Sequence, residues 1–284
     1  MKKVSLQSEI VESATFKNYI REKIIYNVEK DLSSVAWVCR PKRRRRVKFP
    51  AVLCCHGHGP GKDPLVGLCN NAPCLEYHKL VAVRLAQRGY LTITPDRRGY
   101  GDCSQFIKGF PTAQNLLELD AFYQNTKGLS LLAMDIRDSF RAIDAIASRK
   151  DVDTNTIGCL GMETGASVAA GVTAMDERIN AVSLISFISP WPNLPGVSQL
   201  PLMAGKAGSV EFCGLICPRP LQVQMPEADP SIPLPLARKA TKKVEQFYRL
   251  ENSTGRFYPH SFDGVLELDF PSVVDFFDHW FDIK

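Results

Sequence analysis

Four residues whose side chains suit acid–base or nucleophilic chemistry follow short strand-like runs of apolar and β-branched residues. They are Glu163, Asp229, His260 and His58, the last within the glycine-rich bend HGHGPG at 56–61. Ligands of open α/β sheets bind at the carboxyl ends of the strands, so we expect these groups at one edge of a sheet. Carboxylates and imidazoles there can act as nucleophiles or general bases, and backbone N–H groups of a glycine-rich bend can stabilise an oxyanion. The pattern indicates an enzyme site.

The elements that position these residues alternate along the chain. From Val47 onward, short β-branched runs alternate with longer segments of helical periodicity, which is typical of a mostly parallel sheet built from βαβ units. The expected strands span 51–55, 90–94, 156–160, 181–186, 221–225 and 254–258, and the expected helices span 78–88, 130–149 and 272–281. The predicted fold class is α/β.

One domain is expected, because 284 residues of which 45% are hydrophobic can build one large core. Residues 47–284 are predicted to form this core. Residues 1–46 are predicted to add an N-terminal helix and an antiparallel hairpin to the same domain. The stretch 190–214 is rich in Pro and Gly and has little periodicity, so we expect a lid-like insert near the site.

Charge and cysteine usage argue against several classes of protein. Much of the formal charge of +5 comes from residues 42–48, which we interpret as the solvated tip of a hairpin because they lie between two strand-like stretches. No aromatic residues interleave with these charges, which argues against a site for single-stranded nucleic acid. The nine cysteines lie mostly in apolar runs and lack metal-ligand spacing, so neither a disulfide framework nor a metal site is expected. No stretch approaches the ~18 apolar residues of a membrane span, and the first residues lack a signal-peptide core. We expect a cytoplasmic protein with no nucleic-acid or membrane partner.

Several motifs resemble one known family. They are PAVLCCHGHG at 50–59, RGYLTITPDRRGYGD at 88–102, DIRDSFRAIDAIASRKDVDTNTIGCLGMETG at 135–165 and ICPRPL at 216–221. In order and spacing these motifs resemble the dienelactone-hydrolase and acetyl-xylan-esterase-like branch of the α/β-hydrolases, over roughly residues 47–281. The resemblance implies an α/β-hydrolase fold with a mostly parallel central sheet flanked by helices.

The resemblance also assigns roles to individual residues. It implies Asp229 as the catalytic acid and His260 as the catalytic histidine. It also implies the backbone N–H groups of Thr164 and His58 as oxyanion donors. Along the chain the elbow, the acid and the histidine follow one another in the order of an α/β-hydrolase triad. The apex of the nucleophile elbow Gly-Met-Glu-Thr-Gly falls on Glu163, where the family has serine. The acyl-serine route to ester hydrolysis is therefore not implied for this chain.

A glutamate at the elbow supports a different chemistry. At a helix N-terminus and close to His260, the carboxylate of Glu163 is expected to be ionised. As a nucleophile toward sp³ carbon it would form an ester that water, activated by His260, then hydrolyses. As a general base it would act without a covalent intermediate. Either route gives a hydrolase-type enzyme that acts on a small organic substrate without a cofactor.

Other interpretations of these residues stay open on the sequence. The chain can be a non-catalytic binding protein of the same fold, or a serine esterase whose serine has been replaced. Asp229 also suits a turn before Pro230, which leaves Glu227 as an alternative acid. Trp191 near the expected lid and Tyr100 in the loop after the second core strand are candidate substrate-binding residues. The substrate and the oligomeric state are not predicted.

Overall fold

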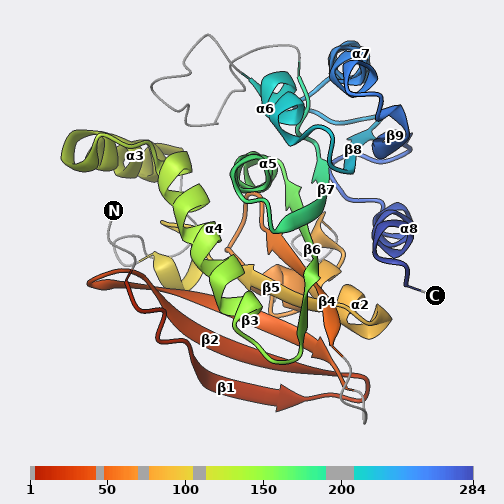
Figure 1. Cartoon of the computed structure of the whole chain (residues 1–284). Helices are drawn as coiled ribbons and strands as arrows, with labels where there is room; N and C mark the ends of the chain where they lie inside the picture. The colour runs from red at the N-terminus through yellow and green to blue at the C-terminus, as the bar shows by residue number, and fades with distance from the viewer. Residues whose placement is uncertain (1–3, 43–47, 70–76, 105–112, 190–207, 284) are drawn as a thin grey trace.

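The computed structural model describes residues 4–42, 48–69, 77–104, 113–189 and 208–283, and within them the chain forms one nine-stranded sheet (Figure 1). The strand order is β1-β2-β3-β5-β4-β6-β7-β8-β9. The strands are β1 (Glu9–Thr15), β2 (Tyr19–Glu29), β3 (Leu32–Pro41), β4 (Phe49–Cys55), β5 (Leu91–Pro95), β6 (Val152–Met162), β7 (Ile179–Ile185), β8 (Leu221–Pro226) and β9 (Phe257–Phe262). Neighbours from β1 to β5 pair antiparallel, whereas those from β5 through β4 to β9 pair parallel. The expected α/β class is confirmed.

Helices cover both faces of the sheet (Figure 1). The described helices are α2 (Val81–Arg88), α3 (Ala113–Lys127), α4 (Leu131–Ala147), α5 (Thr164–Met175), α6 (Ser209–Ile216), α7 (Leu234–Leu250) and α8 (Phe270–Phe281), with short 3₁₀ turns η1 (Asp63–Val66), η2 (Gly101–Cys103) and η4 (Thr254–Arg256). Helices α4, α5, α6 and α7 share one apolar core with the sheet, and α2 and α8 share the other. The result is a three-layer arrangement.

Successive side chains of a strand point to opposite faces of the sheet, which gives the protein two apolar cores. In β4, Leu53 faces the core beneath α4 and α5, and its neighbour Cys54 faces the core beneath α2 and α8. In β6, Cys159 and Leu160 divide in the same way. Central strands buried on both faces have near-continuous apolar sequences, as these have. Among the described residues, no helix combines the length and apolar character that crossing a membrane requires.

The expected N-terminal helix is wrong for the described part of residues 1–46. Residues 9–15 and 19–29 form strands β1 and β2 instead. The reason is a period of two: Ile24, Tyr26 and Val28 are buried while the residues between them are half-exposed. Three antiparallel strands therefore precede the parallel part of the sheet.

The expected hairpin around residues 42–48 is also wrong. Strands β3 and β4 are not neighbours, because β5 lies between them and pairs with both. The antiparallel hairpin of the N-terminal region is formed by β2 and β3. Residues 43–47 lie outside the described residues, so the exposure of the basic run to solvent stays a prediction.

The last strand and the insert also differ from expectation. Residues 254–256 form the turn η4, so β9 begins three residues later than predicted and contains His260, which is opposite Gln224 of β8. Most of the expected insert, 190–207 with Trp191, lies outside the described residues. Its last residues begin α6, where Val210 and Cys213 are buried in the core, so this end of the stretch is not a lid.

A glycine in β6 tests the packing between the sheet and α8. A methyl group added at Gly158 would lie 2.6 Å from Cε1 of Phe277, whereas one added at Gly255 would meet nothing within 4 Å. Gly158→Ala should therefore lower the free energy of unfolding by about 1–3 kcal/mol, because overpacking forces Phe277 out of its position. Gly255→Ala should leave stability near that of the parent. Urea unfolding of the two variants compares these costs, and equal stabilities would contradict this account of the packing.

Candidate active site

Glu163 stands on a sharp turn between β6 and α5. Its φ of 48° and ψ of −117° lie outside the regions that non-glycine residues ordinarily occupy. A methyl group at Gly161 would lie 2.7 Å from Cα of Ala166, and one at Gly165 would lie 2.5 Å from the carbonyl oxygen of Cys55. Because only glycine fits at these positions, α5 closes tightly on β4 and β6. The chain therefore turns sharply from strand to helix at Gly-Met-Glu-Thr-Gly.

The side chain of Glu163 is bound by His58 from the bend after β4. Oε2 of Glu163 accepts a hydrogen bond from the His58 backbone N–H at 3.2 Å and lies 2.7 Å from the ring atom Nδ1. The Glu163 side chain is 13% exposed and that of His58 is 58% exposed. One donor expected to stabilise a substrate oxyanion thus contacts the elbow carboxylate itself. The other predicted donor, the N–H of Thr164, begins α5, where backbone N–H groups have no partner within the helix.

The electrostatics favour an ionised Glu163. Burial raises the pKa of this carboxyl, but the hydrogen bonds and charge of His58, together with the nearby phenol of Tyr77, outweigh burial and lower it. A carboxylate that donors hold in its charged form is available as a nucleophile or as an acceptor for an imidazole N–H.

Tyr77, a residue that sequence reasoning missed, adjoins Glu163. A methyl group at Gly57 would clash with the Tyr77 hydroxyl and lie 3.0 Å from Oε2 of Glu163, so these atoms border the same small space. Burial raises the pKa of Tyr77 strongly, and the charges of Glu163 and Asp229 raise it further. Tyr77 is therefore a protonated donor beside the elbow. Tyr77 does not follow a predicted strand in the sequence, so it is not among the predicted site residues.

Asp229 lies after β8, as expected, but its contacts are those of a turn. Oδ1 accepts hydrogen bonds from the backbone N–H groups of Ser231 at 2.8 Å and Ile232 at 3.1 Å. The residue is buried. The alternative acid, Glu227, has a side chain 49% exposed and lies 3.9 Å from Arg238. The turn interpretation of Asp229 thus accounts for its described hydrogen bonds.

His260 contacts a carboxylate that the sequence analysis did not select. Its Nε2 lies 2.8 Å from Oδ2 of Asp269, at the start of α8. Asp269 occupies the N-cap position, yet its side chain makes no capping hydrogen bond and binds His260 instead. Three strand spacings of about 4.8 Å separate His260 from Glu163, so their backbones are about 14 Å apart along the sheet. The sequence predicts that His260 pairs with Asp229 and lies close to Glu163, whereas in the structure His260 contacts Asp269.

His56 and Tyr100 support the loops rather than contact solvent. The backbone N–H of Arg97 donates to Nε2 of His56 at 3.1 Å, so the proton is on Nδ1, which donates to the Gly57 carbonyl at 2.9 Å. Burial and the charge of Arg97 lower the pKa of His56 well below 6.5, which keeps the ring neutral. Tyr100 is 2% exposed and packs edge-on against His56. The expected substrate contact of Tyr100 is thus not available in this conformation, because the ring is buried.

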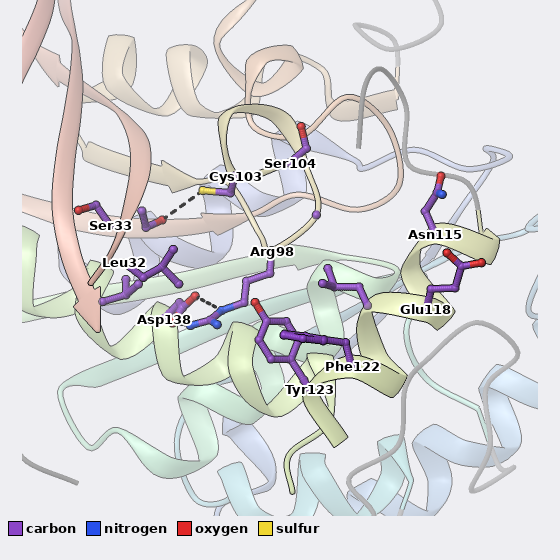
Figure 2. Close-up of a pocket in the computed structure, with 14 residues that line it drawn as sticks. Leu32, Ser33, Arg98, Cys103, Ser104, Asn115, Glu118, Phe122, Tyr123 and Asp138 are labelled. Atoms are coloured by element: carbon purple, nitrogen blue, oxygen red, sulfur yellow. Dashed lines mark hydrogen bonds and ion pairs between the residues drawn. The ribbon is translucent and has the colours of Figure 1, made fainter. Parts of the chain in front are cut away.

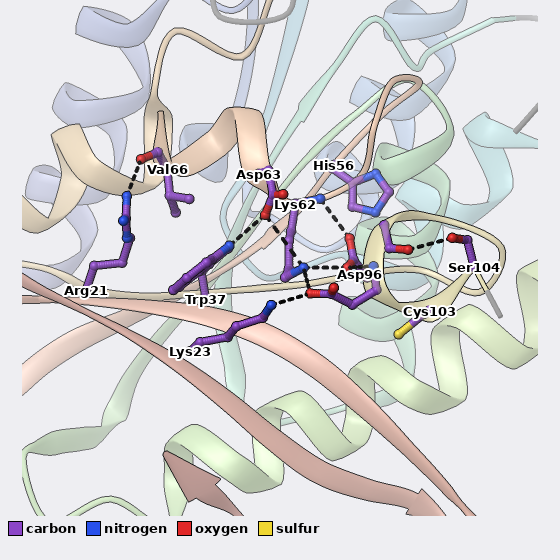
Figure 3. Close-up of polar contacts among 12 residues, drawn as sticks. Arg21, Lys23, Trp37, His56, Lys62, Asp63, Val66, Asp96, Cys103 and Ser104 are labelled. Atoms are coloured by element: carbon purple, nitrogen blue, oxygen red, sulfur yellow. Dashed lines mark hydrogen bonds and ion pairs between the residues drawn. The ribbon is translucent and has the colours of Figure 1, made fainter. Parts of the chain in front are cut away.

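A buried lysine fixes the bend that carries His58. Nζ of Lys62, whose side chain is 1% exposed, lies 2.6 Å from carboxylate oxygens of both Asp96 and Asp102 (Figure 3). The backbone N–H groups of Lys62 and Asp102 donate to Asp96 at 2.8 Å. Burial raises the pKa of Asp96 to about 6, and the ammonium of Lys62 limits that rise. The loops after β4 and β5 are joined through this network.

Arg97 connects the same loop to the elbow. Its Nη1 donates to the hydroxyl of Thr164 at 2.7 Å, and its Nε donates to Asp135 at 2.9 Å. Hydrogen bonds of Asp and Arg side chains thus hold the segment 96–102 in place. Among the described residues, no group of three or more His, Cys, Asp or Glu side chains is arranged to hold a metal ion.

Comparison with known proteins agrees with this architecture. No family model matches the chain. Among curated proteins it is similar to "Putative hydrolase YtaP" of Bacillus subtilis (strain 168), with 28% identity over 212 residues that cover 71% of this chain and 67% of that protein. Among solved structures it is similar to a putative acetyl xylan esterase from Bacteroides fragilis, with a TM-score of 0.73 and 16% identity over 93% of this chain and 74% of that one. The chain has the α/β-hydrolase fold.

A second solved structure supports the fold in the same way. Methylesterase BT1017 matches with a TM-score of 0.74 and 18% identity, covering 98% of this chain and 59% of that one. The chain therefore spans less than two thirds of the methylesterase. At these identities the likeness shows the fold, and the chemistry has to be argued from the site.

The network around Lys62 yields a stability prediction. Lys62→Met would leave the carboxylate of Asp96, whose side chain is 0% exposed, without its ammonium partner. The free energy of unfolding should fall by about 3–5 kcal/mol, as is usual when one member of a buried ion pair is removed. Lys23→Met is the matched control, since Lys23 contacts the more exposed Asp102 and should cost less than about 1 kcal/mol. Chemical denaturation of both variants measures the difference, and similar losses would show that Asp96 does not depend on Lys62.

The lowered pKa of Glu163 yields a pH prediction. A carboxyl whose pKa is lower in the folded protein than its ordinary 4.5 contributes stability above that pH, and the contribution disappears as pH falls through the folded pKa. The parent should exceed Glu163→Gln in unfolding free energy by about 1 kcal/mol at neutral pH, with the difference shrinking below pH 4.5. Urea titrations across this range provide the measurement. A difference independent of pH would mean that the carboxylate charge does not stabilise the elbow.

Proposed function

We propose that this protein is a hydrolase in which Glu163 attacks an sp³ carbon of a small organic substrate, such as an epoxide or a haloalkane. The supporting observation is the position of Oε2, which is held by two donors of His58 at 3.2 Å and 2.7 Å. With Oε2 held, Oε1 is the oxygen that attacks. The likeness to a protein named as a hydrolase supports the reaction class.

The first step forms an ester. Oε1 of Glu163 donates an electron pair to the substrate carbon, and the bond from that carbon to the halide or epoxide oxygen breaks. A halide leaves as the anion, whereas an opened epoxide leaves an alkoxide that takes a proton from a nearby donor. Tyr77 suits this donation, because its phenol adjoins Glu163 and its raised pKa keeps it protonated.

The second step uses the same contacts. Water adds to the ester carbon Cδ, and the developing negative charge falls on Oε2, which the His58 N–H already contacts. The tetrahedral intermediate releases the alcohol, which keeps Oε1 and takes the proton that His260 removed from water. The regenerated carboxylate keeps one oxygen from water, and its second proton returns to Tyr77 after epoxide opening or goes to solvent after a halide has left. We assign the activation of water to His260, which carries a carboxylate partner at 2.8 Å. In this proposal Asp269 orients His260, and Asp229 shapes the turn after β8.

A second route has its own supporting observation. Nδ1 of His58 contacts Glu163, so the other ring nitrogen, Nε2, is available to take a proton from water. The His58 side chain is 58% exposed. Such a pair can activate water for direct attack on an ester without a covalent intermediate, since the carboxylate fixes the tautomer that has its lone pair on Nε2. The solved structures named above are esterases, which supports an ester as the substrate of this route.

Isotope transfer separates the two routes. Single turnover in water enriched in the heavy oxygen isotope, with panels of epoxides, haloalkanes and esters, should place one heavy oxygen in the peptide that contains Glu163. Glu163→Gln should lower turnover at least a hundredfold, because the nucleophile is lost. Glu245→Gln, which removes an exposed carboxylate of α7, is the control and should keep full activity. His260→Gln should accumulate substrate mass on Glu163.

Two other outcomes would contradict the covalent route. Turnover that depends on Glu163 and His58 but leaves no heavy oxygen in the protein would favour the direct route. If neither turnover nor adduct appears with any panel, while ligands that survive incubation raise the melting temperature, the chain is a binding protein of this fold.

A further inference from the structure

A chain of buried polar side chains crosses the layer between the sheet and α8. It consists of Ser183 of β7 with Gln222 and Gln224 of β8, each at most 3% exposed. The hydroxyl of Ser183 donates to Oε1 of Gln222 at 2.7 Å, and Nε2 of Gln224 donates to the same oxygen at 3.3 Å. The surrounding core is largely apolar. Burial of polar groups is costly unless they are paired, so the other partners of these amides show what the chain holds in place.

Gln224 binds both backbone groups of Asp269, the residue before α8. Its Oε1 accepts a hydrogen bond from the Asp269 N–H at 2.9 Å, and its Nε2 donates to the Asp269 carbonyl oxygen at 3.0 Å. Because one planar amide binds both groups, it fixes the rotation of the Asp269 backbone as well as its position. Gln222 makes a separate contact with α8, in which its Nε2 donates to the carbonyl and hydroxyl oxygens of Ser272 at 3.0 and 2.9 Å.

The fixed backbone determines where the carboxylate of Asp269 points. An aspartate at an N-cap position ordinarily binds backbone N–H groups of the first helical turn. Asp269 makes no such bond, and its Oδ2 lies 2.8 Å from Nε2 of His260 instead. His260 is the residue of β9 directly opposite Gln224. The amide that holds the backbone of Asp269 and the imidazole that its carboxylate binds therefore extend from paired positions of the sheet.

The contact with Asp269 also determines which ring nitrogen of His260 is free. A carboxylate only accepts hydrogen bonds, so the neutral ring carries its proton on Nε2 and its lone pair on Nδ1. In the usual hydrolase triad the carboxylate binds Nδ1, and Nε2 acts as the base. The two nitrogens of His260 have exchanged these roles.

We propose that Gln224 is a positioning residue for the reaction in which His260 activates water. By binding both backbone groups of Asp269, it directs that carboxylate to Nε2 of His260, and Nδ1 becomes the nitrogen that takes a proton from water. The imidazolium keeps Nε2–H on Asp269 and later gives the Nδ1 proton to the departing alcohol. This inference rests on the function proposed for His260, which the experiment tests separately.

The parent protein provides the first test. At a pH of about 8.5, where an ordinary imidazole is neutral, a long-range ¹H–¹⁵N NMR spectrum identifies the protonated ring nitrogen. His260, whose signals are assigned by their loss in His260→Gln, should carry its proton on Nε2. The amide of Asp269 should exchange with deuterium roughly a hundredfold more slowly than that of Phe270, which begins α8 and has no partner within the helix. A proton on Nδ1 in the parent would overturn the proposal without any variant of Gln224.

Gln224→Met removes both hydrogen bonds to Asp269 and keeps the length of the side chain. His260 should then show a mixture of the two tautomers, and the amide of Asp269 should lose its protection. In single turnover of the epoxides and haloalkanes, the ester on Glu163 should form at a rate within about twofold of the parent. The same ester should persist roughly tenfold longer, because the base that activates water is no longer oriented.

Two control variants separate this effect from a general loss of stability. Gln222→Met removes the neighbouring contact with Ser272 but leaves both hydrogen bonds of Gln224 to Asp269. Leu32→Ala removes apolar packing beside a cavity of about 330 Å³ that adjoins β3, six strand positions from β9 (Figure 2). Both variants should keep the proton of His260 on Nε2 and the parent rates of ester formation and breakdown.

The outcomes distinguish this inference from the proposed function. If His260 keeps its proton on Nε2 in Gln224→Met, or if the two control variants change the tautomer equally, Gln224 does not position the pair. A changed tautomer with unchanged ester breakdown would overturn the role of His260 in the reaction, and the role of Gln224 with it. If no substrate forms an ester on Glu163, the proposed function fails, and the tautomer and exchange measurements still decide whether Gln224 directs Asp269.

Discussion

The close approach of α5 to the carboxyl end of β4 is the constraint on which the site depends. Gly165 lies against the carbonyl oxygen of Cys55, so the bend that follows β4 has to pass directly over the elbow. That passage brings the backbone N–H and the ring of His58 to the same oxygen of Glu163. The strained backbone of Glu163 persists because sheet and helix hold both of its ends. The chemistry proposed for the carboxylate follows from this packing.

Buried charges hold the loops that the packing brings together. Lys62 joins the bend after β4 to Asp96 and Asp102 of the next loop, and Arg97 joins that loop to α5. The ion pair of Lys62 with Asp96 lies where water is excluded, so loss of either partner leaves an uncompensated buried charge. Irregular segments at the active edge of the sheet are thereby given fixed positions without regular secondary structure. Rigid support of this kind is what a catalytic carboxylate requires.

The sequence predicts the parallel sheet and the sharp turn at Glu163 well because both depend on local patterns. Gly161 and Gly165 bracket Glu163, and apolar runs mark the central strands. The N-terminal strands are harder to predict, because apolar Ile25 lies on the half-exposed face between buried Ile24 and Tyr26 and weakens the period of two. The partner of His260 was missed for a different reason: Asp269 has the position of a helix cap, and only the tertiary structure shows that its side chain binds His260. The place of Tyr77 likewise depends on contacts between distant segments, whereas the contacts of Asp229 are those of a local turn.

The hydrogen bond from His58 to Glu163 also has a consequence for selectivity. The backbone N–H of His58, which would bind a substrate carbonyl oxygen, already donates a hydrogen bond to the carboxylate of Glu163. Glu163 would therefore compete with an acyl ligand for this donor. Any ester carbonyl has to displace it, at the cost of breaking a charged hydrogen bond, before it can use that donor. Substrates that react at saturated carbon need no such displacement. In the proposed reaction, this hydrogen bond would therefore favour substrates that react at saturated carbon over esters.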